Sequence, residues 1–132
     1  MKIITVVAAI WQRADGRFFL AQRAAGQSFA GQWEFPGGKL EAQETEPQAL
    51  AREMEEEFGV RAKIGPFFME SLHPYKPQKI IRLRAYWLAS VQGEPQALEH
   101  AQLAWVLPQE LLNYALSQAD IPIAKALLKQ LD

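Results

Sequence analysis

The chain has 132 residues, of which 49% are hydrophobic, and this length and composition fit a single domain with its own core. It contains no cysteine, which excludes disulfides, thiolate metal sites and catalysis by a sulfur nucleophile. The formal net charge of −1 argues against a surface for nucleic acid. We therefore expect residues 1–132 to form one domain that binds any phosphate-bearing ligand at a local site.

The first elements of the chain are predicted to be strands. Residues 3–11 are rich in Ile, Val and Thr. Residues 17–22 form a second apolar segment after Ala14-Asp15-Gly16, so the two segments are expected to pair as a β-hairpin. Residues 1–10 are too short to cross a membrane and show no signal-peptide cleavage pattern. A cytoplasmic protein with no membrane partner is therefore the expectation.

A loop is expected over residues 24–32, followed by a short apolar stretch over residues 33–35. This stretch ends at Pro36-Gly37-Gly38, and glycines tolerate positive φ, so a tight turn is predicted there.

A helix over residues 46–58 is predicted by signals at both ends. Thr45 and Gln48 have the spacing of a capping box, and Gly59 is placed just past the helix end. The apolar residues that recur at i, i+4 and i+8 are Leu50, Met54 and Phe58. They predict the buried face of this helix.

Three further strands are predicted from β-rich or alternating patterns, over residues 60–70, 79–90 and 103–107. Residues 73–77, with two prolines, are expected to form the loop between the first two of them. His73 and His100 have no partner at metal-ligand spacing and are interpreted as loop residues.

Two helices are expected in the C-terminal part of the chain. The first begins at Pro108 and ends near Ser117, and Asp120 is placed to cap the second. The residues of the last helix expected to pack on the core are Ile123, Leu127, Leu128 and Leu131. The order of elements predicts a mixed β-sheet flanked by helices, an α+β fold of the α/β/α sandwich type.

Three glutamates of the central helix, Glu53, Glu56 and Glu57, stand at i, i+3 and i+4 and therefore share one face. Like charges at this spacing, near the negative end of the helix dipole, destabilise a helix. A solvated acidic face is the simplest interpretation. The nearby Gly37-Gly38-Lys39 favours another, because carboxylate and carbonyl oxygens are the ligands of Mg²⁺ or Mn²⁺.

These residues form a motif: Gly38, five residues, Glu44, seven residues, then Arg52-Glu53-Met54-Glu55-Glu56-Glu57-Phe58-Gly59-Val60. The motif resembles the Nudix box at every fixed position, which chance does not explain. The segment Trp33-Glu34-Phe35-Pro36-Gly37-Gly38-Lys39 is similar to the MutT branch of the same family. The resemblance implies the Nudix fold and a hydrolase that splits a nucleoside triphosphate into the monophosphate and pyrophosphate.

The resemblance also implies a site for Mg²⁺, or for Mn²⁺ in its place. Its expected ligands are a backbone carbonyl of Gly37 or Gly38 and the side chains of Glu53, Glu56, Glu57 and Glu99. The family pattern leaves open whether Glu53 is a ligand or the general base. An exposed loop acid is the alternative interpretation of Glu99.

Three more residues receive catalytic roles from the resemblance. Arg52 is expected to orient the carboxylates, Lys39 to neutralise charge on phosphate, and Glu44 to support the loop before the helix.

Four residues are candidates for binding the nucleotide: Arg23, Phe35, Tyr75 and Asp120. The alternatives are an exposed strand end for Arg23, core packing for Phe35 and a helix cap for Asp120. Asp120 stands where the MutT enzymes that act on 8-oxo-dGTP have asparagine, and an ionised aspartate only accepts hydrogen bonds. The sequence around Asp120 looks more like the CTP pyrophosphohydrolase relatives.

The expected function is removal of 8-oxo-dGTP or related oxidised nucleotides, with CTP or a modified dCTP as the alternative substrate. A nucleotide-sugar or dinucleoside polyphosphate hydrolase and a non-catalytic Nudix ligand sensor also remain open. The sequence leaves a monomer and a homodimer equally open.

Overall fold

The computed structural model describes residues 1–131. The elements in chain order are β1 (Lys2–Ile10), β2 (Phe18–Gln22), β3 (Trp33–Glu34), β4 (Gly37–Lys39), α1 (Glu46–Phe58), β5 (Arg61–Lys76), β6 (Lys79–Gln92), β7 (Gln102–Val106), the 3₁₀ helices η1 (Pro108–Asn113) and η2 (Gln118–Asp120), and α2 (Ile121–Lys129). None of the helices within residues 1–131 has the length and hydropathy that a membrane crossing needs.

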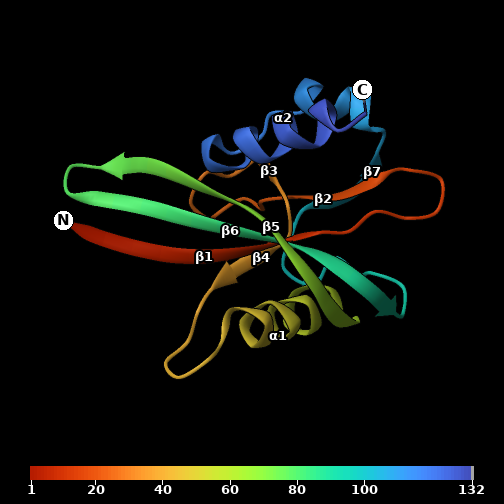
Figure 1. Ribbon diagram of the computed structural model, residues 1–132, viewed down its shortest axis with the longest axis horizontal. Coiled ribbons are helices and arrows are strands. Elements are labelled where there is room, and N and C mark those ends of the chain that lie inside the picture. Colours follow the sequence, from red (N-terminus) through yellow and green to blue (C-terminus); the bar gives the residue numbers. More distant parts are fainter. Residues whose placement is uncertain (132) are drawn as a thin grey trace.

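The strands form two sheets. The larger has the order β4-β1-β6-β5, in which β1 runs parallel to β6 and antiparallel to β4. The smaller has the order β3-β2-β7. The helices α1 and α2 lie on opposite sides of the larger sheet (Figure 1). The predicted α+β fold with a mixed sheet between helices is confirmed.

The alternation of side chains along β1 supplies both cores of the molecule. Val7 and Ala9 point to one side and pack in a cluster with the buried residues of α1. Ala8 and Ile10 point to the other side and pack in a cluster with the buried residues of α2. Successive side chains of a strand point to opposite faces, so one apolar strand serves both layers.

The predicted hairpin between the first two strands is limited to the residues beside the turn. There Phe19 donates to the Trp11 carbonyl, Arg13 donates to the Arg17 carbonyl, and Gln12 bridges to Phe18, but β1 and β2 themselves belong to different sheets. Along its whole length β1 pairs with β6, from Lys2 opposite Lys79 to Ile10 opposite Trp87. This partner is distant in sequence, and local turn chemistry does not reveal it.

The loop predicted over residues 73–77 is wrong, because β5 continues to Lys76. The reversal is confined to Pro77 and Gln78, and Gln78 has a φ of 66°. Pro74 fits into the strand because β5 is an edge strand, where the backbone N–H that proline lacks is not needed by a neighbour.

The central helix α1 has the predicted bounds. The Thr45 side chain accepts from the backbone N–H of Gln48, and the Gln48 side chain accepts from the backbone N–H of Thr45. Gly59 ends the helix in the left-handed conformation, with a φ of 71°. The predicted apolar stripe is fully buried: Leu50, Met54 and Phe58. These local signals hold the acidic face of α1 in a defined position.

The C-terminal segment departs from the prediction in three details. The first helix is a 3₁₀ helix that ends at Asn113 rather than near Ser117. Asp120 makes no side-chain capping bond to α2. Leu131 is half exposed, whereas Ile123 and Leu127 are buried as expected. The Asp120 carboxyl is therefore turned away from the helix it was expected to cap.

Candidate active site

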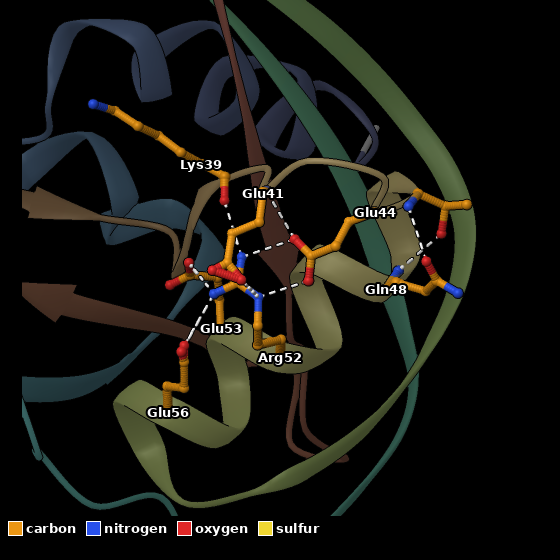
Figure 2. A network of polar contacts seen from close by, with 8 residues as sticks. Lys39, Glu41, Glu44, Gln48, Arg52, Glu53 and Glu56 are labelled. Carbon is orange, nitrogen blue, oxygen red and sulfur yellow. Dashed lines mark hydrogen bonds and ion pairs between the residues drawn. The ribbon is translucent and has the colours of Figure 1, made fainter.

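Arg52 is the centre of a polar network that joins α1 to the preceding loop and strand (Figure 2). Its Nε and Nη2 donate to the two oxygens of Glu44, at 2.7 and 3.0 Å. Its Nη1 donates to Glu53 at 2.9 Å and to Glu56 at 3.0 Å, and Nη2 also donates to the backbone carbonyl of Lys39 at 3.1 Å. The hydrogen bonds from Arg52 to Glu44, Glu56 and Glu53 raise the pKa of Arg52.

Glu44 links the loop to this network. One of its oxygens accepts from the backbone N–H of Glu41 at 2.9 Å, in addition to the two bonds from Arg52. The Arg52 hydrogen bonds, followed by that from the Glu41 backbone, lower the pKa of Glu44. The carboxylate therefore stays ionised and holds the loop against α1.

Glu57 lies beside this network in a site that lacks positive charge. Its Oε1 atom is buried and has no hydrogen-bond partner within residues 1–131. Burial raises the pKa of Glu57 to about 10, helped by a hydrogen bond with Glu53 and by the charges of Glu53, Glu34 and Glu99. A cation among these acids would lower the raised pKa of Glu57, because an opposite charge favours the ionised form.

The acids are not gathered around one point. No three His, Asp or Glu side chains within residues 1–131 are grouped closely enough to hold a metal ion. The carboxylates of Glu53 and Glu56 are instead paired with the Arg52 guanidinium. Convergence on an ion therefore requires these glutamate side chains to rotate.

The two glycines of β4 are required by space rather than by positive φ. The tight turn predicted at Pro36-Gly37-Gly38 is wrong, because both glycines lie in β4 and neither has a positive φ. A Cβ atom on Gly37 would lie 1.8 Å from the backbone oxygen of Val7. A Cβ atom on Gly38 would lie 2.5 Å from the Glu53 carboxyl carbon. The Glu53 carboxyl therefore sits directly over the Gly38 backbone.

The ammonium of Lys39 lies apart from the carboxylates. Figure 2 shows its side chain directed away from Arg52 and Glu53, although its carbonyl is bonded to Arg52. The residue is exposed and borders a cleft on the other side of β4. Lys39 is thus placed to meet a ligand in that cleft.

The cleft has a volume of about 290 Å³ and lies on the side of the sheet that faces α2. The four residues expected to bind nucleotide all line it: Arg23, Phe35, Tyr75 and Asp120. Gly37, Gly38 and Lys39 line it as well. Strand β4 consequently borders both the cleft and the acidic face of α1.

Asp120 is almost fully buried at the cleft, with 4% of its surface exposed. Burial, and next the charge of Glu34, raise its pKa well above the usual value. Contacts with Ser117 and the Phe35 backbone and the charge of Arg23 act in the opposite direction. The raised pKa favours the neutral acid, which donates one hydrogen bond and accepts another. This direction of the pKa shift opposes the expectation of an ionised, accept-only aspartate.

Comparison with known proteins identifies the family. The model of the NUDIX domain matches residues 1–127. The chain belongs to the Nudix family. The chain is 45% identical over 128 residues to the CTP pyrophosphohydrolase of Escherichia coli (strain K12), which covers 97% of this chain and 93% of that protein. It is 40% identical over 127 residues to the 8-oxo-dGTP diphosphatase of Haemophilus influenzae, covering 96% and 89%.

Solved structures agree with this assignment. The Escherichia coli ORF135 protein superposes with a TM-score of 0.87 at 44% identity, covering 98% of this chain and 91% of that chain. A MutT chain from the structures of Aliivibrio salmonicida and Vibrio cholerae gives a TM-score of 0.82 at 30% identity, covering 98% and 99%. The protein is therefore a Nudix hydrolase, a pyrophosphohydrolase of the MutT-like type.

The Nudix site includes residues that sequence reasoning missed. Phe29 lines the cleft, is 53% exposed, has a φ of 58° and lies 5.9 Å from the ring of Tyr75. Glu34 and Ser117 also line the cleft. An exposed aromatic in a loop between Gly26 and Gly31 was the available signal for Phe29. Glu34 lies within the MutT-like segment but has no role in the Nudix box itself.

The loop before β7 holds Glu99 and His100. Glu99 is exposed, and its charge contributes to the raised pKa of Glu57, so it lies on the side of the acidic cluster. His100 is in a loop as expected, but it is buried and bonded to Glu34. His73 lies within β5 rather than in a loop.

Proposed function

We propose that this Nudix hydrolase splits nucleoside triphosphates into the monophosphate and pyrophosphate, with cytosine nucleotides and 8-oxo-dGTP as the substrates that fit its cleft. One observation carries the proposal. Strand β4 lines the cleft on one side, and on its other side the Glu53 carboxyl of α1 lies over Gly38. A nucleotide whose base occupies the cleft would thus lay its phosphates beside the acidic face of α1.

The donor chemistry of these acids fits a divalent cation, on which their side chains converge after rotation. The buried, unpartnered Oε1 of Glu57 and the raised pKa of this acid indicate a site short of positive charge. Oxygen ligands of this kind suit Mg²⁺, or Mn²⁺ in its place. The proposed ligands are Glu53, Glu56, Glu57, Glu99 and a backbone carbonyl of Gly37 or Gly38. When bound, the ion supplies charge neutralisation on the phosphate oxygens and activation of water.

The remaining residues of the network position these groups. Arg52, fixed by its bidentate bond to Glu44, holds Glu53 and Glu56 on one side of the helix. Glu53 is proposed as ligand or general base, since it is the carboxylate nearest to Gly38. Lys39 faces the cleft side and is proposed to neutralise charge on phosphate as the bond breaks.

Asp120 is proposed to read the base. A neutral carboxylic acid matches a base edge that offers one donor beside one acceptor. Cytosine presents its N4 amine beside N3, and oxidised guanine presents N7–H beside O6. Unmodified guanine presents two acceptors, N7 and O6, in the same place. Phe35 and Tyr75 are proposed to contact the base rings, and Arg23 the substrate.

The relatives named for CTP and for 8-oxo-dGTP support both substrates equally. The test is release of pyrophosphate from CTP, 5-methyl-dCTP, 8-oxo-dGTP and dGTP with saturating Mg²⁺, and again with EDTA. Cytosine nucleotides and 8-oxo-dGTP should have the highest kcat/KM, and EDTA should abolish turnover. Equal kcat/KM for dGTP and 8-oxo-dGTP would contradict the role of Asp120, and no pyrophosphate from any nucleotide would contradict the function.

A further inference from the structure

His100 is a buried histidine that packs against the end of the catalytic helix. Its side chain is 3% exposed, and its ring stacks on Phe58 with the centroids 5.2 Å apart and the planes at 20°. Its Nε2 lies 2.9 Å from Oε2 of Glu34. The Nδ1 atom is buried and has no partner among the described residues. A ring needed only for packing would be filled more stably by phenylalanine, because a buried polar atom without a partner costs free energy.

The partner of His100 reaches into the cleft. Glu34 lines the cleft and also accepts from Nη1 of Arg23, at 3.3 and 3.4 Å to its two oxygens. Arg23 lines the cleft too, and its Nε donates to the backbone carbonyl of Ser28 at 2.6 Å. A chain of polar contacts therefore runs from His100 through Glu34 to Arg23.

The hydrogen bond from His100 to Glu34 is shorter than the two from Arg23 to Glu34. An ionised carboxylate only accepts, so Nε2 of His100 is the donor in this pair. At 2.9 Å this bond is near the optimal length, whereas the Arg23 contacts are at the long end of the range.

We propose that His100 is a positioning residue that holds Glu34, and through it the guanidinium of Arg23, in the nucleotide cleft. This inference rests on the proposed function, since it assigns the effect to nucleotide binding. Loss of the His100 donor allows the Glu34 carboxylate to rotate. Arg23 then keeps its hydrogen bond to the Ser28 carbonyl but loses those to Glu34. The effect should fall on KM, because the residues of α1 that surround the reacting phosphate keep their contacts.

Two substitutions separate the hydrogen bond from the packing. His100→Phe keeps a ring against Phe58 and removes the donor. His100→Gln removes the ring and places an amide nitrogen as far along the side chain as Nε2. We expect His100→Phe to raise KM roughly tenfold with kcat little changed, as for loss of a hydrogen bond to a charged group. His100→Gln should recover most of the wild-type KM, whereas His100→Asn, whose nitrogen is too short, should not.

The Arg23 background gives a further arm. In Arg23→Ala, the added His100→Phe change should raise KM no further, because the guanidinium that His100 positions through Glu34 is already absent. The same KM in His100→Phe as in wild type, or equal KM values for the Phe and Gln variants, would overturn the inference. If His100→Phe does not fold, the comparison of Gln with Asn decides, and equal KM values for that pair overturn it.

A readout without turnover keeps the two proposals apart. In ¹⁵N NMR spectra, the Arg23 Nε–H signal should shift in His100→Phe and return toward the wild-type position in His100→Gln. An unshifted Arg23 signal in His100→Phe contradicts the inference whatever the activity. A wild-type protein that hydrolyses no nucleotide contradicts the proposed function, while the Arg23 signal still decides whether His100 positions this residue.

Discussion

Two carboxyl groups, those of Glu57 and Asp120, are kept from water on opposite sides of β4. Burial is the main cause of the raised pKa at both. Their surroundings differ, because Glu57 is next to other acids of the catalytic helix while Asp120 is next to Ser117 and the Phe35 backbone. Under the proposed function, the first environment would bind a cation and the second a nucleotide base, although burial raises the pKa at both.

Substitution of Glu56 or Glu57 by glutamine is predicted to lower kcat by roughly 10²–10³-fold, the loss typical of removing one electrostatic contact from a reacting centre. The fold should be kept, because the pKa of about 10 makes metal-free Glu57 neutral near pH 7 and glutamine resembles that form. Glu55→Gln is the matched control, since Glu55 is exposed on the same helix. Wild-type kcat in both the Glu56→Gln and the Glu57→Gln variants would remove these residues from the site.

Asp120→Ala is predicted to reduce discrimination between cytosine and guanine nucleotides, because buried donors or acceptors of the base lose their partner. The expected loss is about 1–3 kcal/mol, or roughly tenfold to a hundredfold in kcat/KM for the good substrates. Asp120→Asn should retain most of this preference, since an amide also donates and accepts. The measurement is kcat/KM for CTP, 5-methyl-dCTP, 8-oxo-dGTP and dGTP. A parallel loss for all four nucleotides would show that Asp120 contributes only to stability.

Single residues of the site were predictable to the extent that the Nudix box specifies them. Arg52 and Glu44 lie together as their positions in the box imply. A sequence motif does not show how a side chain is protonated. The raised pKa of Asp120 depends mainly on its burial, which only the structure shows. Phe29 and His100 lie outside the box, and their contacts depend on strands that are remote in the sequence.

At the scale of elements, the short strand β4 lies between the cleft and the acidic face of α1. Its two glycines make room for different neighbours. A methyl group on Gly37 would meet the backbone of β1, which cannot yield. A methyl group on Gly38 would meet the end of the flexible Glu53 side chain, which can move aside. The same substitution at neighbouring positions thus tests the fold at Gly37 and the position of the Glu53 carboxyl at Gly38.

Gly37→Ala is predicted to destabilise the protein by about 1–3 kcal/mol or more, as for other overpacked sites, and to lower its Tm. Gly38→Ala should nearly keep the Tm and lower kcat, because it displaces the Glu53 carboxyl. The measurements are thermal unfolding and pyrophosphate release for both variants. Equal losses of Tm in the two proteins, with wild-type kcat for Gly38→Ala, would contradict this division.

Elements were predictable where their signals are local. The bounds of α1 follow from the capping box at Thr45 and the left-handed Gly59, which are contacts within a few residues. The partner of β1 could not be predicted, because its ladder is made with residues 79–87, on the far side of α1 in the sequence. The continuation of β5 through Pro74 was hidden for the same reason, since only the sheet order shows that this strand is at an edge.

At the scale of the whole molecule, the metal-free protein is predicted to lose stability as the pH rises. Glu57 would release its proton near its ordinary pKa of 4.5 in the unfolded chain, but near 10 in the folded one. In this interval the unfolded chain binds fewer protons, so the free energy of unfolding falls with increasing pH. Asp120 contributes with the same sign. The Tm measured in EDTA should therefore decrease from about pH 5 to about pH 9.

In Glu57→Gln, the Tm in EDTA should decrease less steeply with pH, and the remaining decrease should be due to Asp120. In Glu55→Gln, the Tm should depend on pH as in wild type. Saturating Mg²⁺ should raise the Tm most at high pH, because carboxylate ligands bind metal in their deprotonated form. A Tm in EDTA that rises over this interval, or identical slopes for wild type and Glu57→Gln, would contradict the raised pKa of Glu57.

Successive side chains of β1 point to opposite faces, so substitutions at odd and at even positions of this strand affect different parts of the molecule. Side chains at its odd positions, such as Val7 and Ala9, support the helix that carries the glutamates. Ile4 and Val6, at even positions, line the cleft, which Val7 also borders. Mutations that exchange one accepted nucleotide for another can therefore accumulate on the even positions while the hydrolytic machinery is inherited intact. An insertion of a single residue in β1 would exchange these two faces and abolish both properties at once.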